Sequence, residues 1–244
     1  MFPGVGTLIN IVAIVAGASI GVLVGHRLRS TTRILITDVL GLVTLLAGAS
    51  ALSPMWSSQF LGAFGDGVAL LVILAALIVG GLIGSALQLE EKLDGLGQIL
   101  RKKFGASTQT PFVEGFVSAS FLFAIGPLAI LGAVSDGMST GIDQLLLKST
   151  LDLFAAMAFA SSLGWGVAAS AIPVGIYQGA WTIVGLLLGE ILMPYQVDAM
   201  SVVGGVLLIT IGFRLLSIKN VAVGNLLPAL ALAPVIALLA HSFL

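Results

Sequence analysis

Long apolar runs separated by short polar segments extend along the whole chain. Eight runs approach the roughly 20 residues that a helix needs to cross a bilayer. They cover residues 5–25, 34–52, 67–87, 113–134, 145–165, 171–192, 199–217 and 221–242. This pattern predicts an all-α polytopic membrane protein with about eight transmembrane helices. Because the runs take up most of the sequence, residues 1–244 are expected to form a single membrane domain.

Residues 89–104 follow a different pattern. Apolar residues recur there at helical spacing, with charged residues between them. The apolar positions are Leu89, Leu93, Leu96, Leu100 and Phe104. This spacing predicts an amphipathic helix that lies on the inner membrane surface rather than across the bilayer.

The composition excludes several classes of protein. The chain is 58% hydrophobic and only 9% charged, whereas a soluble domain carries about 25% charged residues. A soluble enzyme is therefore excluded. A net charge of -1 provides no basic surface for nucleic acid. With no Cys, two distant His and no catalytic or metal-ligating pattern, we expect no enzymatic activity, no metal and no cofactor.

The positions of the basic residues predict the orientation. Lys and Arg cluster after the first, third and seventh runs. With eight crossings, these clusters all fall on one side, which the positive-inside rule makes cytoplasmic. Lys148 is then the one exception among the ten basic residues. Both termini are expected to face outward.

Ionisable residues inside the runs are candidates for function. A charge at the bilayer centre costs about 2.5–3.5 kcal/mol on insertion scales, so it is rarely there without a reason. Lys148 and Asp152 are one helical turn apart and could pair. Glu114 and Asp152 are interpreted as part of a substrate or ion pathway. The alternative is that each makes a structural hydrogen bond between helices.

Glycine and proline residues near these acids predict interrupted helices. Such breaks free backbone groups, and many transporters build midplane sites from them, although breaks used only for packing look the same. The predicted break positions are Gly126, Pro127, Gly164, Gly166 and Pro173. With nearby hydroxyl and amide groups, the predicted pathway comprises Glu114, Asp152, Ser118, Ser120, Ser161, Ser162, Gln178, Asn10 and Asn225.

Two further patterns concern symmetry. Glu114 and Asp152 are each followed by Phe at +2 and +7 and by Gly at +12, on runs of opposite direction. This similarity suggests an inverted-topology repeat and predicts that both acids reach one cavity. Gly17, Gly21 and Gly25 form a small-residue stripe, and similar stripes occur in the third and sixth runs. Such close-packing surfaces favour a homo-oligomer, most simply a dimer.

Several segments together form a recognisable signature that covers almost the whole chain. They are Gly6–Asn10, Val113–Ser120, Ser135–Gly137, Lys148–Asp152, Phe159–Val167, Ser170–Val174, Tyr177–Gly179 and Asn225–Ala229. The signature resembles the YqgA-like family of uncharacterised bacterial inner-membrane proteins, a family of unknown function. The resemblance implies a multi-pass protein of the bacterial plasma (inner) membrane. It implies neither an enzymatic activity nor a particular substrate.

These observations predict a transporter of a small solute or ion through a central polar cavity, to which protons or sodium could be coupled. The expected partners are membrane lipid and the unknown solute or ion, with no nucleic acid. The alternative is a membrane scaffold or accessory subunit, in which polar residues only tie helices together, and a channel is the third reading.

Overall fold

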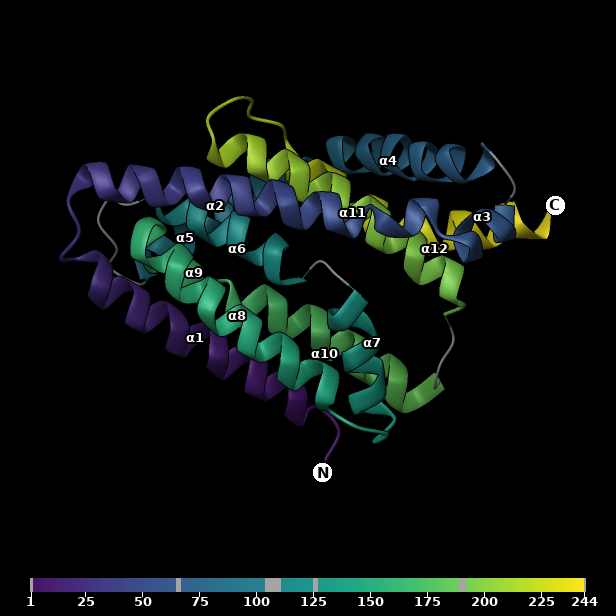
Figure 1. Cartoon of the computed structure of the whole chain (residues 1–244), viewed down its shortest axis with the longest axis horizontal. Helices are drawn as coiled ribbons and strands as arrows, with labels where there is room; N and C mark the ends of the chain where they lie inside the picture. Colours follow the sequence, from purple (N-terminus) through teal and green to yellow (C-terminus); the bar gives the residue numbers. More distant parts are fainter. Residues whose placement is uncertain (1, 65–66, 104–110, 125–126, 189–191, 244) are drawn as a thin grey trace. The chain divides into compact units, whose positions relative to one another are not determined.

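The structure is a computed structural model that describes residues 2–64, 67–103, 111–124, 127–188 and 192–243. Its regular elements in this part of the chain are helices (Figure 1). The long ones are α1 (Val5–Gly25), α2 (Ser30–Ala51), α4 (Val68–Ala86), α8 (Asp143–Leu163), α10 (Ala171–Leu188), α11 (Pro194–Leu215) and α12 (Leu227–Ser242). The shorter ones are α3 (Ser58–Phe64), α5 (Leu89–Lys103), α6 (Phe112–Ala124), α7 (Pro127–Gly137), α9 (Gly166–Ala169) and the 3-10 turns η1 (Ser53–Trp56) and η2 (Val223–Leu226).

The predicted all-α membrane architecture is confirmed. Within the described residues, seven helical segments are long and apolar enough to cross a membrane, and α9 with α10 forms one of them. The fourth predicted run is a bent pair, α6 and α7, whose axes differ by 64°. Counting this pair as one crossing gives eight. Residues 89–103 form α5, as their amphipathic spacing predicted, and Phe104 lies outside the described residues. Helix α3 was not predicted.

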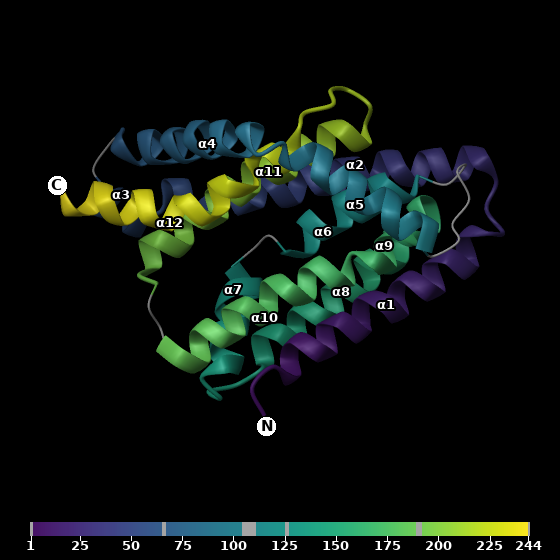
Figure 2. The ribbon, with the colours of Figure 1, turned by 180° about the vertical axis from the view of Figure 1, so that it is seen from behind.

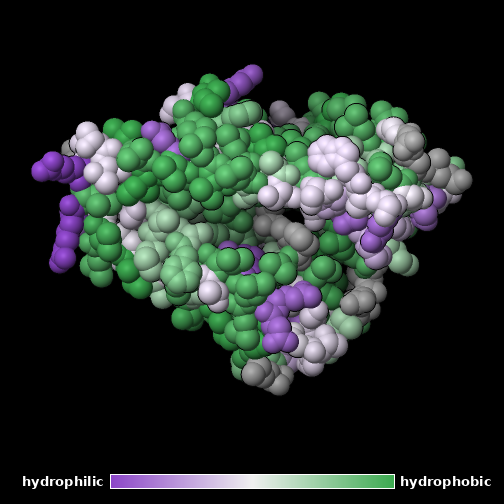
Figure 3. Space-filling view, in the orientation of Figure 1, coloured by the Kyte–Doolittle hydropathy of each residue, from purple (hydrophilic) through white to green (hydrophobic). Residues whose placement is uncertain are grey.

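Large apolar side chains face outward along the long helices. Leu46 is 68% exposed, Ile176 70% and Leu187 72%. Hydrophobic residues cover most of the face seen in Figure 3. In water this exposure would be unfavourable, whereas lipid tails solvate such side chains well. The surface therefore supports a location within a membrane.

One compact unit contains α1 and α6–α10, together with the first part of α2 and the end of α5. Its most extensive contact joins α1 to α8, which lie side by side (Figure 1). The glycines of the α1 stripe each face a backbone carbonyl of α8, and a Cβ at any of them would overlap that oxygen. The successive pairs are Gly17 with Leu153, Gly21 with Met157 and Gly25 with Ser161.

These pairs show that α1 and α8 run parallel, because residue numbers rise together along both helices. Helices α2, α4 and the α6–α7 pair lie between them in sequence. Three crossings between α1 and α8 make the two helices parallel, whereas two would make them antiparallel. The packing therefore supports the α6–α7 pair as one full crossing rather than a re-entrant loop, and so supports eight crossings.

The other compact unit contains α3, α4, α11 and α12, together with the second part of α2 and the start of α5. Helix α4 packs against α12 and η2 (Figure 2), with Gly80 against Ala229 and Gly84 against Asn225. These pairs make α4 and α12 antiparallel. The small-residue stripe of α4 is thus used within the chain, like that of α1.

Candidate functional site

Six polar side chains from three helices are buried together in the unit that contains α1. No member is more than 6% exposed, although all belong to membrane-spanning segments. We call this group the polar cluster. Its members are Thr7 and Asn10 on α1, Lys148 and Asp152 on α8, and Gln178 and Thr182 on α10.

The charged part of the polar cluster is an ion pair. Lys148 Nζ donates a hydrogen bond to Asp152 Oδ2 across one turn of α8. The Asn10 side chain also lies within hydrogen-bonding reach of the Asp152 carboxylate. The pair is neutral overall, which lowers the cost of holding two ionisable groups away from water.

The uncharged part of the cluster contains polar atoms without partners. Asn10 Nδ2 donates a 3.2 Å hydrogen bond to Gln178 Oε1. Within the described part of the chain, buried Asn10 Oδ1 and Gln178 Nε2 have no hydrogen-bond partner. The site can therefore accept one hydrogen bond and donate another.

Further hydrogen bonds continue the polar cluster toward the first turn of α1. The Thr7 and Thr182 hydroxyls lie 3.3 Å apart, and Thr182 donates to the Gln178 carbonyl oxygen at 3.0 Å. One residue before Thr7, the Gly6 amide donates to the Asp136 carboxylate at 2.9 Å. Polar contacts thus join α1 to α10 and α7 along the end of α1 where the chain begins.

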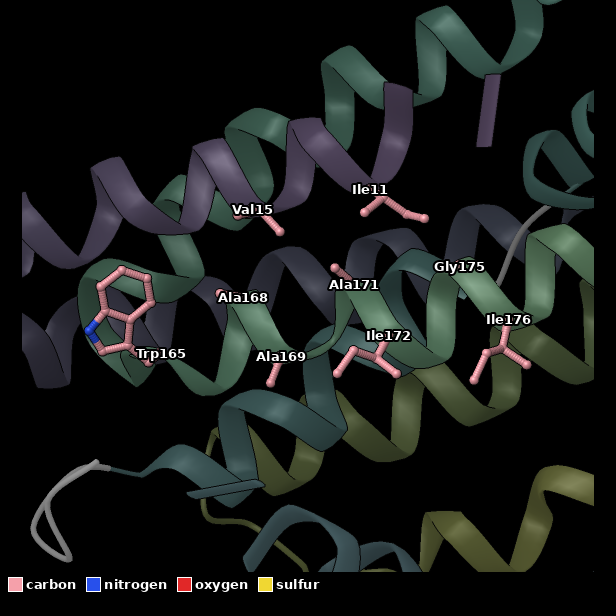
Figure 4. Close-up of a pocket in the computed structure, with 9 residues that line it drawn as sticks. All are labelled: Ile11, Val15, Trp165, Ala168, Ala169, Ala171, Ile172, Gly175 and Ile176. Atoms are coloured by element: carbon pink, nitrogen blue, oxygen red, sulfur yellow. The ribbon is translucent and has the colours of Figure 1, made fainter. Parts of the chain in front are cut away.

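An apolar groove of about 930 Å³ lies between α1 and α9–α10, and its lining includes no member of the polar cluster. Figure 4 shows its lining, which comes from α1, α9 and α10 and from Trp165 just before α9. Ile11 and Val15 form the α1 side, and Ala171 and Gly175 lie on the α10 side. Gly175 packs directly against Ile11, because a Cβ there would lie only 2.7 Å from Ile11 Cδ1.

A comparison with protein families identifies the chain. Residues 5–238 match the family model described as "Protein of unknown function (DUF554)". The chain belongs to this family. It is 31% identical over 240 residues to "Uncharacterized protein YqgA" of Escherichia coli (strain K12), covering 94% of each chain. It is also 29% identical over 238 residues to "Uncharacterized membrane protein YdfK" of Bacillus subtilis (strain 168), covering 98% of this chain and 97% of YdfK. No solved structure matches.

These matches confirm the family resemblance seen in the sequence, and the name of YdfK supports a membrane location. The descriptions of the DUF554 family and of these two relatives specify no substrate.

The structure does not bring the two predicted acids together. Glu114 lies in the first turn of α6, where the neighbouring Gly115 packs against Leu163 at the end of α8. Asp152 is 11 residues earlier on α8. At 1.5 Å per residue this separation is about 16 Å along the helix axis. Glu114 thus lies near the Leu163 end of α8, away from Asp152, so the structure does not support the prediction that both acids reach one cavity.

The predicted serines also lie outside the polar cluster. Ser120 and Ser161 donate to carbonyl oxygens of their own helices, four and three residues earlier. The Ser162 hydroxyl is hydrogen-bonded to Thr37 of α2. Ser118 is fully buried on α6, and its hydroxyl has no partner among the described residues. Of the nine predicted pathway residues, the structure joins Asn10, Asp152 and Gln178.

Asn225 belongs to the other compact unit, where it holds the start of α5. Its Oδ1 accepts a 3.0 Å hydrogen bond from the Glu90 amide. The Glu90 carboxylate in turn accepts hydrogen bonds from Arg214 at 2.9 Å and from the Gly224 amide at 2.5 Å. These contacts tie α5 to α11 and η2, so the structure gives Asn225 a role in anchoring α5.

The predicted helix breaks are located as follows. Gly164 ends α8 with a φ of 75°, a left-handed conformation that favours glycine. Gly166 begins α9, where a Cβ would overlap the Phe112 carbonyl oxygen. Pro173 lies in the first turn of α10, just after the α9–α10 junction, and Pro127 is the first residue of α7. Gly126 lies outside the described residues.

Sequence reasoning did not include Thr7 and Thr182 among the pathway residues. The available signal was their helical spacing, because Thr7 lies three residues from Asn10 and Thr182 lies four residues from Gln178. No group of three His, Asp or Glu side chains in the described part of the chain could hold a metal ion.

Proposed function

We propose that this protein is an integral membrane transporter of a small solute without net charge, which binds at the polar cluster between α1, α8 and α10. The observation that carries the proposal is the buried pair of unsatisfied atoms, Asn10 Oδ1 and Gln178 Nε2. An unpaired buried polar group costs about 1–3 kcal/mol. A solute that offers one donor and one acceptor would remove both costs at once.

The charge of the polar cluster favours a solute without net charge. Lys148 and Asp152 already neutralise each other. An added cation or anion would leave one uncompensated charge inside the membrane, which costs about 2.5–3.5 kcal/mol on insertion scales. Coupling to protons or sodium, which the sequence left open, would require the ion pair to separate.

Reconstituted protein in liposomes can test the proposal. Uptake of labelled glutamine, leucine and glycerol would be compared with uptake of acetate and choline. Movement of a dye-labelled alkyl amide between leaflets would be followed by dithionite reduction of the dye. Asn10→Leu and Gln178→Leu should each lower the flux of the preferred solute about tenfold, because each removes a hydrogen bond to a buried group.

Ser120→Ala is the matched control, because the Ser120 hydroxyl bonds only to a carbonyl of its own helix in the structure. It should leave flux unchanged. Two results would reject the proposal: no member of the panel moves faster than through protein-free liposomes, or the Asn10 and Gln178 variants transport like the wild type.

A membrane scaffold is the alternative function, and one observation favours it. Several intramembrane hydroxyls, including those of Ser120, Ser149 and Ser161, are satisfied by carbonyls of their own helices. If the polar cluster also serves only packing, the Asn10 and Gln178 substitutions should change stability without changing any flux.

The orientation and assembly also remain proposals. We infer a bacterial inner-membrane protein with both termini outside, supported by the distribution of Lys and Arg and by the parallel packing of α1 with α8. We retain the homodimer as a prediction only. The glycine stripes of α1 and α4 that favoured it, and Gly185 of α10, pack against helices of the same chain.

A further inference from the structure

We propose that the free face of α5 binds anionic phospholipids of the cytoplasmic leaflet. Acyl chains cover the exposed apolar side chains of this face, and the basic side chains at the C-terminal end of the helix hold the phosphate groups. This inference goes beyond the proposed function and does not depend on transport of any solute.

One face of α5 is packed against the protein. Gly97 lies against the start of α6, where a Cβ on this glycine would come within 3.2 Å of the Val113 side chain and 3.4 Å of the Phe116 ring. Gly97 is also the one buried residue of α5. This contact fixes which side of the helix faces the protein, and it leaves the opposite side free.

The free face of α5 exposes two large apolar side chains. Leu96 is 43% exposed and Ile99 is 63% exposed. The two residues are three positions apart, so they share one side of the helix. With 3.6 residues per turn, Gly97 lies about 130° around the helix from the midpoint of this pair. Leu96 and Ile99 therefore point away from the contact with α6.

The position of α5 in the chain explains what covers this apolar face. Unlike α4, α5 is not one of the described helices that are long and apolar enough to cross a bilayer. It joins the end of α4 to the start of α6, and both of these ends are cytoplasmic in the inferred eight-crossing orientation. A helix on the membrane surface buries its apolar side chains at the boundary between headgroups and acyl chains. Leu96 and Ile99 therefore contact lipid rather than water.

The charges of α5 select an anionic headgroup. Its acidic residues all lie in the first six positions, whereas its last three residues are Arg101, Lys102 and Lys103. Within the described part of the chain, no acid forms an ion pair with these three side chains. The cytoplasmic leaflet has a negative surface potential, and each Lys or Arg near it strengthens binding about fivefold. The basic end of α5 therefore favours anionic over zwitterionic phospholipids.

Lipid-selective quenching in liposomes would test this inference on the full-length chain. The chain has no Cys, so Gly95→Cys provides a single site on α5 for an NBD fluorophore, and a Cβ there meets nothing within 4 Å. Nitroxide-labelled phosphatidylglycerol and nitroxide-labelled phosphatidylcholine are compared at the same low mole fraction in phosphatidylcholine liposomes. Both should quench, with association about tenfold stronger for phosphatidylglycerol. Salt at about 1 M should remove most of this preference, because it shortens the Debye length to about 3 Å.

Two double variants test the role of the basic end. Lys102→Gln with Lys103→Gln should keep the quenching but reduce the preference for phosphatidylglycerol to less than about twofold. Arg27→Gln with Arg29→Gln is the matched control, because it removes two exposed positive charges from the same inferred side of the membrane. This control should leave the preference unchanged.

A third double variant tests the apolar contact. Leu96→Ser with Ile99→Ser should lower quenching by both lipids, because the free face of α5 then loses its apolar side chains. Equal quenching by the two lipids in the wild type would overturn the inference, and so would an unchanged preference in the Lys102 and Lys103 variant. Absence of quenching by either lipid would also overturn it, since α5 would then face water. The comparison of lipids and salts in the wild type decides the question even if a variant fails to fold.

Discussion

The Lys148–Asp152 pair permits a quantitative test of how the polar cluster is held in the membrane. The two side chains are 5% and 6% exposed and bonded to each other. Removing one partner leaves the other charge buried alone, which costs about 3–5 kcal/mol. Lys148→Met and Asp152→Leu should therefore each lower the free energy of unfolding by about that amount.

The double variant should behave differently. Replacing both charges with apolar groups is often neutral for a buried pair, and the only further loss is the Asp152 contact to Asn10, about 1 kcal/mol. We thus expect the double variant to unfold within about 1 kcal/mol of the wild type. The coupling energy between the two positions should be at least about 5 kcal/mol, the sum of the two single losses less that of the double variant.

Unfolding in mixed dodecyl maltoside–dodecyl sulfate micelles, followed by circular dichroism, would measure these free energies. Thr150→Ala on α8 is the control, because Thr150 is exposed and bonds only to a carbonyl of its own helix in the structure. A double variant as unstable as the worse single variant would show that the two charges do not compensate each other, and the reasoning would be wrong.

Three further predictions concern other parts of the molecule. Gly21→Ala should destabilise the protein by about 1–3 kcal/mol, because the added methyl overlaps a carbonyl of α8; Gly95→Ala on α5 meets nothing within 4 Å and should be neutral or stabilising in the same unfolding assay. Glu90→Ala should lower the free energy of unfolding by about 2–4 kcal/mol, because the Arg214 side chain and the Gly224 amide lose a charged acceptor. Faster proteolysis of α5 would report this loss. In intact cells, an impermeant thiol reagent should label Ser139→Cys but not Ser30→Cys, and the opposite pattern would reverse the inferred orientation.

The sequence predicted those features that the membrane itself determines. Hydrocarbon thickness sets the length of a spanning helix, so apolar runs located the spanning segments to within a few residues. The same argument could not predict the 64° bend in the fourth run, because a hydropathy pattern indicates how long an apolar segment is but not the direction of its helix axis. Helix α3 was missed because seven residues are too few to register as a membrane span.

The candidate site was only partly predictable, because the partner of a buried polar side chain depends on how neighbouring helices are aligned in space. The i,i+4 spacing of Lys148 and Asp152 identified their pairing. The repeat that linked Glu114 with Asp152 could not place the acids together, because Glu114 lies near the Leu163 end of α8 whereas Asp152 lies near the middle of that helix. Asn225 looked like a pathway residue, but the charged start of α5 provides it with a different partner, the Glu90 amide.

The parallel packing of α1 on α8 has a consequence for biosynthesis. The glycine face of α1 packs against carbonyl groups of α8, which is synthesised later. The last residues of the two helices, Gly25 and Leu163, are 138 residues apart. At about 5–20 residues per second this interval is roughly 7–28 s. During that time the glycine face of α1 is exposed to lipid. A nascent chain stopped before Asp143 would therefore leave the glycine face of α1 open to contact with other helices until α8 is made.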